Sequence, residues 1–192
     1  MATTALAGEQ AAVKVVVFFR AVNLGQKNCP SRAQFEATFR EAGGEAPRSF
    51  LTNGTLVFNA RHETAARRIV RAARKRLAET CGLTEPAFLR RLDDMARLVE
   101  SDPFAGISRR AVYRFCVSFF DGKPAGVRVP RRSSRGDVEV VRLTRGEMLS
   151  IVRKLGSGPG SPTLLLENAL GRPATTRVWN TLVRLVARFH ND

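Results

Sequence analysis

VKVVVFFRAVNLG, from Val13 to Gly25, is the stretch with the strongest preference for a β-strand. Its first seven residues are almost all β-branched or aromatic, and a short polar turn begins at Arg20. Apolar side chains at both alternating positions are typical of a strand that is covered on two faces. We therefore expect a strand buried on both sides, against which the rest of the chain packs.

The next eighty residues predict one compact unit. Ser31-Arg32-Ala33-Gln34 has the form of a capping box, so a helix should begin there and end near Gly43-Gly44. Asn53-Gly54 predicts a tight hairpin with positive φ at both residues. A helix with a basic outer side, His62–Cys81, and a short strand, Pro86–Arg91, complete the order strand, helix, strand, strand, helix, strand. This is the split βαβ or ferredoxin-like order, which brings the turn after the first strand and the hairpin tip to the same end of the sheet.

The remainder of the chain predicts a second α+β unit. Its expected elements are a helix at Met95–Glu100, a strand at Ala111–Phe120 with one more solvated face, a mobile basic connection at Asp121–Asp137, strands at Val138–Leu143 and Met148–Arg153, a helix from Ser161 to Leu170, and a last helix at Arg177–Phe189 capped by Thr175 or Thr176. The predicted organisation is a disordered tail at 1–12, a ferredoxin-like first half at 13–91, and a second α+β half with C-terminal helices at 92–192. The fold class is thus α+β, with two fused ferredoxin-like halves and mainly antiparallel sheets.

Composition limits the classes of function. A chain of 192 residues can hold a core without disulfides or metals, and it contains no apolar run of membrane-spanning length. Its three cysteines lack CxxC spacing and only two histidines accompany them, which predicts a cytoplasmic protein with no structural metal and no cofactor. The net charge of +15 favours anionic partners. Because 27 of the 32 basic residues are arginine, a compositional bias explains the charge equally well.

Three stretches carry a family resemblance: FFRAVNLGQKN at 18–28, FLTNGTLVF at 50–58 and ALGRPATTRVWNTLVRL at 169–185. Together they resemble the bacterial family called domain of unknown function 1697, whose pattern has R-G-I-N-V-G-G, S-G-N before a strand, and A-T-T-R-N-W-N-T. This chain departs from that pattern at several positions, among them Ala21, where the family has glycine. The resemblance implies a two-part α+β fold with ferredoxin-like halves, and it implies no reaction.

A binding site for a small anionic or phosphorylated ligand is the first functional hypothesis. Arginine can hold a phosphate or carboxylate through two parallel hydrogen bonds, and exposed turn amides add donors. The candidate residues, all placed at or near the end of the first sheet, are Arg20, Asn23, Gly25, Asn53, Gly54, Thr176, Arg177, Trp179 and Asn180. The alternative is structural, because such polar residues also stabilise turns and Trp179 can belong to the core.

Two other classes of function remain open. Nonspecific nucleic-acid binding would use arginine-rich surfaces, with Arg67, Arg68, Arg71, Arg74, Lys75, Arg131, Arg132 and Arg135 as candidates. For the first five of these residues, a solvated helix face is favoured over an anion-binding stripe. The third class is a protein-interaction or assembly domain of unknown oligomeric state. No P-loop, HExxH helix or nucleophile elbow occurs, so the sequence favours a binding protein over an enzyme without deciding the matter.

Overall fold

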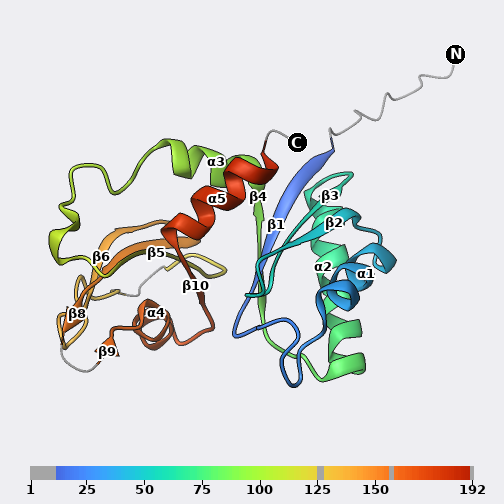
Figure 1. Ribbon diagram of the computed structural model, residues 1–192, viewed down its shortest axis with the longest axis horizontal. Helices are drawn as coiled ribbons and strands as arrows, with labels where there is room; N and C mark the ends of the chain where they lie inside the picture. Colours follow the sequence, from blue (N-terminus) through green and yellow to red (C-terminus); the bar gives the residue numbers. More distant parts are fainter. Residues whose placement is uncertain (1–11, 125–127, 156–157, 191–192) are drawn as a thin grey trace, which may run out of the picture.

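The computed structural model describes residues 12–124, 128–155 and 158–190. Within them the chain is an α+β protein with two four-stranded antiparallel sheets and five α-helices (Figure 1). The predicted α+β class with mainly antiparallel sheets is confirmed, whereas the fourth strand of the second sheet was not predicted. Nearly all of the predicted tail, and residues 125–127 of the basic connection, lie outside the described part. Among the described helices, none is long and apolar enough to cross a membrane.

The first sheet contains the strand predicted from VKVVVFF at its centre. Its elements are, in chain order, β1 (Val13–Phe19), α1 (Arg32–Glu41), β2 (Glu45–Phe50), β3 (Thr55–Ala60), α2 (Glu63–Cys81) and β4 (Ala87–Arg91). The strand order across the sheet is β2-β3-β1-β4, with antiparallel neighbours. The predicted order of strands and helices is therefore confirmed. Ser31 caps α1 in a complete capping box with Gln34, also as predicted.

The second sheet has the strand order β10-β5-β7-β6 and is likewise antiparallel. The remaining elements are α3 (Leu92–Glu100), a 3₁₀ turn η1 (Arg109–Ala111), β5 (Arg114–Phe119), β6 (Val138–Leu143), β7 (Glu147–Val152), the short pair β8 (Lys154–Leu155) and β9 (Gly158–Pro159), α4 (Pro162–Leu170), β10 (Thr175–Val178) and α5 (Trp179–Phe189). Ser161 caps α4 and Gly171 follows it in the left-handed conformation.

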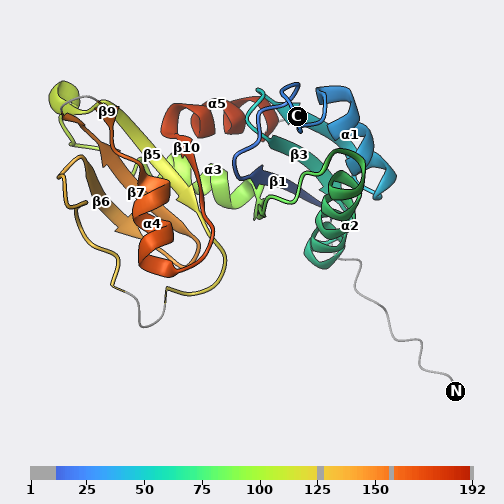
Figure 2. The same cartoon turned by 90° about the horizontal axis from the view of Figure 1, so that it is seen from below.

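The layers explain why β1 has apolar residues at every position but one. Val15, Val17 and Phe19 face α1 and α2, whereas Val16 and Phe18 face the second half of the chain. There the Phe18 ring stacks on Phe119 of β5 with 4.1 Å between the ring centroids. The helices α3 and α5 lie beside this contact, between the two sheets (Figure 2). The prediction that β1 is covered on both faces is confirmed.

Three local predictions are wrong. The Asn53-Gly54 hairpin is not a two-residue turn: four residues join β2 to β3, and positive φ occurs at Leu51 and Gly54 instead of Asn53 and Gly54. The last helix begins at Trp179, because residues Thr175–Val178 pair with β5 as a strand. The second face of β5 is not solvated, since Ser118 is fully buried on the side covered by α4.

Candidate functional site

The turn after β1 and the β2–β3 loop meet at one end of the first sheet. The Leu24 N–H donates to the Thr52 carbonyl at 2.7 Å, and the Phe19 N–H donates to the Gly54 carbonyl at 2.8 Å. Gly54 has a positive φ of 67°, and a Cβ added there would lie 2.6 Å from the Val22 Cβ. The predicted meeting of these two segments is therefore confirmed, and Gly54 is required by both its conformation and its close contact.

Arg177 of β10 joins this end of the first sheet to the second sheet. Its side chain is almost completely buried, and all five guanidinium N–H groups can be assigned to neutral oxygen acceptors. The acceptors are Thr55 Oγ1 (3.0 Å), Thr175 Oγ1 (2.8 Å), Thr176 O (3.0 Å), Phe19 O (2.8 Å) and Asn53 O (2.8 Å). Burial lowers the pKa of Arg177 to about 10, so the group still carries its charge at neutral pH. Three of the five acceptors belong to the first half, which makes Arg177 a structural link between the halves.

A cavity of about 340 Å³, here called the junction cavity, opens beside Arg177. Its lining is Arg20, Ala21, Val22, Asn53, Thr163, Ala174, Thr175, Thr176 and Arg177. The structure thus brings together four of the candidate residues: Arg20, Asn53, Thr176 and Arg177. Asn23 and Gly25 lie in the exposed turn that follows β1 and do not line the cavity, and Gly54 lies beneath that turn. Trp179 and Asn180 belong to a different cavity, described below.

Arg20 is engaged by two carboxylates. Its Nε and Nη2 donate to Glu167 of α4 at 2.7 and 3.2 Å, and its Nη1 donates to Glu85 at 3.1 Å. These ion pairs raise the pKa of Arg20 further above its ordinary value. The expectation of a guanidinium available to a ligand is corrected, because the carboxylates already neutralise the charge. Arg20 is, like Arg177, a link between the two halves.

Glu167 should make stability depend on pH in a defined direction. The hydrogen bond from Arg20, with smaller contributions from the Ala174 N–H and the Arg20 charge, lowers the pKa of Glu167 from its ordinary 4.5, against the opposing effect of burial. A lowered folded-state pKa gives stability that is present above the unfolded-state value and is lost as pH falls through the folded-state value. Glu167→Gln should therefore cost about 1 kcal/mol at pH 7, and this difference from wild type should shrink below pH 4.5.

Urea midpoints measured from pH 7 down to acid conditions test the role of Glu167. Glu139, whose pKa is lowered chiefly by a hydrogen bond from Arg153, is present in both proteins and cancels from the comparison. A difference between wild type and Glu167→Gln that is the same at every pH would contradict the assignment.

Ala21 has a left-handed backbone conformation, with φ at 49°. This conformation costs an alanine about 1–2 kcal/mol relative to the right-handed region, whereas glycine adopts it freely. The glycine of the family pattern at this position is therefore explained by the path of the turn. No ligand is needed to account for it.

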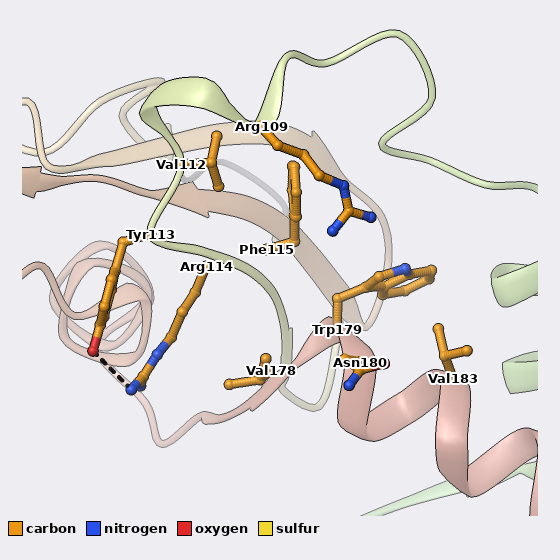
Figure 3. Close-up of a pocket in the computed structure, with 9 residues that line it drawn as sticks. All are labelled: Arg109, Val112, Tyr113, Arg114, Phe115, Val178, Trp179, Asn180 and Val183. Atoms are coloured by element: carbon orange, nitrogen blue, oxygen red, sulfur yellow. Dashed lines mark hydrogen bonds between the residues drawn. The ribbon is translucent and has the colours of Figure 1, made fainter.

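A second and larger cavity, here called the aromatic groove, lies where β5 and η1 face the start of α5. Its volume is about 590 Å³, and its lining is Arg109, Val112, Tyr113, Arg114, Phe115, Val178, Trp179, Asn180 and Val183 (Figure 3). The end of β10 and the first turns of α5 place Val178, Trp179, Asn180 and Val183, while η1 and the start of β5 place the other five. Trp179 is half-buried against Phe104, with 5.2 Å between the ring centroids, and Tyr113 is 44% exposed.

The two arginines of the aromatic groove are held by aromatic rings. The Arg109 guanidinium lies 5.4 Å from the centroid of the Phe115 ring, and that of Arg114 lies 4.6 Å from the centroid of Tyr113. Arg114 also donates to the Tyr113 hydroxyl at 3.0 Å. Both arginines are exposed, and within the described parts of the chain neither has a carboxylate within ion-pair distance. Their charge is positioned but not neutralised, which distinguishes this groove from the junction cavity.

The family follows from a direct comparison. The family model described as "Protein of unknown function (DUF1697)" matches residues 13–148, which is more than half of the chain. The chain belongs to the DUF1697 family. The match includes the motifs at 18–28 and 50–58 and ends before the motif at 169–185, which supplies Arg177, Trp179 and Asn180.

A solved structure is similar to this DUF1697 chain in fold. It is the structure of the conserved bacterial protein SP0830 from Streptococcus pneumoniae. The superposition covers 92% of this chain and 98% of SP0830, with a TM-score of 0.62 and 15% sequence identity. At this identity the similarity concerns the fold alone. Neither description names an activity, and a comparison with curated proteins finds no match.

The predicted basic surfaces of the DUF1697 chain are exposed but largely paired. On α2, Arg67 forms an ion pair with Glu63 and Lys75 with Glu79, and Arg74 donates to the carbonyls of Thr84 and Glu85. The other two predicted residues of this helix, Arg68 and Arg71, are exposed. In the connection before β6, Arg132 forms an ion pair with Glu139 and Arg135 with Asp137, while Arg131 is exposed. These contacts favour the solvated-face interpretation of α2. Nucleic-acid binding through these surfaces stays a prediction.

Seven of the nine residues that line the aromatic groove were not predicted from the sequence, among them the charged and aromatic residues Arg109, Tyr113, Arg114 and Phe115. The segment RRAVYRF at 109–115 does carry a recognisable signal, because basic and aromatic residues alternate closely in it. No group of three or more His, Cys, Asp or Glu residues that could hold a metal ion occurs in the described ranges.

Proposed function

We propose that this protein binds a small anionic molecule in the aromatic groove. The observation that carries the proposal is the pair Arg109 and Arg114, which are exposed at one cavity and have no carboxylate partner among the residues described. A guanidinium with unused N–H groups binds phosphate or carboxylate through two parallel hydrogen bonds. Cavities of 300–1,000 Å³ with apolar walls and a few polar groups are typical ligand sites.

Preorganisation supports the same proposal. Stacking on Phe115 and Tyr113 restricts the rotamers of the two arginines before any ligand arrives. Binding then requires less ordering of long side chains, which otherwise costs about 0.5–1.5 kcal/mol for each one. The net charge of +15 further raises the local concentration of anions around the molecule.

Pyrophosphate titration is the direct test, and the sequence provides a local probe. Trp179 is the single tryptophan of the chain, so its indole N–H gives one resolved peak in a ¹⁵N–¹H correlation spectrum. We expect pyrophosphate to shift this peak. At a concentration tenfold above Kd, it should also add about 1.4 kcal/mol to the free energy of unfolding.

Arg109→Ala and Arg114→Ala should each weaken pyrophosphate binding by about tenfold, since a charge-assisted hydrogen bond contributes about 1.5–3 kcal/mol. Arg68→Ala on α2 is the matched control, because it removes one exposed positive charge far from the groove and should leave affinity within about twofold (Figure 1). Equal weakening by all three variants would show a general charge effect and overturn the proposed site. An unmoved Trp179 peak would also overturn it.

The junction cavity is a second candidate for the same class of ligand. The observation in its favour is that Arg177 carries a buried charge that only neutral oxygens contact, so its field extends into the cavity. Against it stand the carboxylates that already neutralise Arg20. Thr163→Val, at the cavity wall, would weaken pyrophosphate binding only if the ligand lies there.

We also propose that the two halves are copies of one ferredoxin-like plan. The support is the strand order: β4-β1-β3-β2 in the first sheet corresponds, position by position, to β10-β5-β7-β6 in the second. In this correspondence α4 takes the place of α2, and the described residues of the connection between β5 and β6, 120–124 and 128–137, contain no counterpart of α1. The aromatic groove then belongs to the second copy alone.

A further inference from the structure

We infer that the anion bound in the aromatic groove is part of a nucleotide, with its base against Tyr113 and Trp179 and its phosphate held by Arg109 and Arg114. This inference rests on the proposed function and names the class of ligand. It depends on three features of the groove that a plain phosphate site does not require: aromatic surface, an apolar wall and an unused amide.

The aromatic surface is the first feature. Tyr113 and Trp179 reach the groove from different elements, η1–β5 and α5, and Figure 3 shows them on opposite sides of the hollow. A nucleobase is a planar π-system that stacks on aromatic rings. Arg114 lies over one face of the Tyr113 ring and donates one N–H to the Tyr113 hydroxyl, which leaves its other N–H groups for the phosphate.

The wall and the amide are the second and third features. Val112, Val178 and Val183 give the groove an apolar wall, which a free inorganic anion would not favour. Asn180 is exposed at the margin, and no hydrogen bond of its side chain to another described residue is found. An asparagine amide offers a donor and an acceptor side by side, the arrangement that reads the edge of a base such as adenine.

The positive charge beside the groove is compatible with two kinds of ligand that contain a nucleotide. Arg110 is exposed next to Arg109, so a second phosphate could be bound outside the groove. A free mononucleotide and a single-stranded nucleic acid both supply the chemistry, a base followed by phosphate. The experiment therefore includes both.

Calorimetric titrations of the full chain with ribose 5-phosphate, adenosine, AMP and a six-residue oligoadenylate separate the contributions. We expect AMP to bind at least tenfold more tightly than ribose 5-phosphate, because stacking adds to phosphate binding. If oligoadenylate binds much more tightly than AMP and its affinity depends steeply on salt, the ligand is a single-stranded nucleic acid. If oligoadenylate and AMP bind with equal affinity, the ligand is a free nucleotide. In a parallel series of ¹⁵N–¹H correlation spectra, AMP must shift the Trp179 indole peak.

Tyr113 offers a matched pair of variants. Tyr113→Phe keeps the ring and removes the hydroxyl that holds Arg114, whereas Tyr113→Ala removes both. Tyr113→Ala also releases Arg114 from the ring on which it lies, so ribose 5-phosphate should bind somewhat more weakly to Tyr113→Ala than to Tyr113→Phe. AMP affinity should differ by about tenfold between the two variants, which is a clearly larger difference because AMP alone also loses base stacking. Tyr113 is 44% exposed, so both variants should fold.

The possible failures are distinct. If ribose 5-phosphate and AMP bind equally and both shift the Trp179 peak, the groove is an anion site and the nucleotide inference is overturned. If adenosine alone binds, the arginines have no role and the proposed function is overturned as well. If none of the four compounds shifts the Trp179 peak, the nucleotide inference is overturned, and if pyrophosphate does not shift it either, the proposed function is overturned as well.

Discussion

Gly54→Ala should lower the free energy of unfolding by about 3–4 kcal/mol, which for a chain of this size is a fall of about 10 °C in Tm. Two effects add. The positive φ of 67° costs alanine about 1 kcal/mol. The new Cβ would also lie 2.6 Å from the Val22 Cβ and 3.0 Å from the Phe19 Cβ. Because neither Cβ can move by side-chain rotation, the backbone of β1 or of the loop must shift.

Gly25→Ala is the matched control for Gly54→Ala. Gly25 also has positive φ, at 83°, but nothing lies within 4 Å of an added Cβ. It should therefore cost only the conformational part, about 1 kcal/mol. Urea denaturation of the two variants measures the difference. Equal losses would show that the contact between Gly54 and the turn after β1 is looser than the structure indicates.

The first sheet was predictable because its signals are local. The apolar run before Arg20, the capping box at Ser31 and the basic side of α2 each depend on residues within one element. The Asn53-Gly54 turn fails as a prediction for the opposite reason. Three carbonyls of its loop accept from distant groups: Leu51 O from Arg32, Thr52 O from Leu24, and Asn53 O from Arg177. These hydrogen bonds favour a four-residue loop, and their donors cannot be recognised from the sequence of the loop itself.

The start of the last helix shows a signal that was present but misinterpreted. Thr175 and Thr176 are good caps, yet residues 175–178 are also rich in β-branched side chains, and pairing with β5 makes them a strand. That strand directs Arg177 toward the first sheet and leaves Trp179 at the beginning of α5. The candidate residues thus divide between two cavities. No sequence rule relates Arg20 to Glu167, 147 positions away, so the neutralisation of Arg20 could not be foreseen.

Arg177→Met should cost about 3 kcal/mol of unfolding free energy. Methionine fills much of the same volume and removes the penalty of a buried charge, which favours the variant. Five hydrogen bonds are lost, however, and those to Thr55 Oγ1, Thr175 Oγ1 and Phe19 O are buried. Phe19 O keeps the Thr175 hydroxyl as a donor at 3.3 Å, so the cost falls mainly on the other acceptors. Each unsatisfied buried group costs about 1–3 kcal/mol, so the loss of these bonds outweighs the gain. Arg177→Lys should be intermediate, because it keeps the charge but not five donors in one plane.

Two measurements separate this role of Arg177 from a general effect of charge. Arg184→Met on α5 removes an exposed arginine that lies 5.9 Å from the Phe50 ring centroid, and it should change stability by no more than about 0.5 kcal/mol. A double-mutant cycle of Arg177→Met with Thr55→Val should give a coupling of about 1 kcal/mol, since the two side chains share a 3.0 Å hydrogen bond across the halves. If Arg177→Met were as stable as wild type and showed no coupling, Arg177 would not link the two sheets. Its buried charge would then be free to serve a ligand in the junction cavity, which the pyrophosphate titration of the Thr163→Val variant would detect.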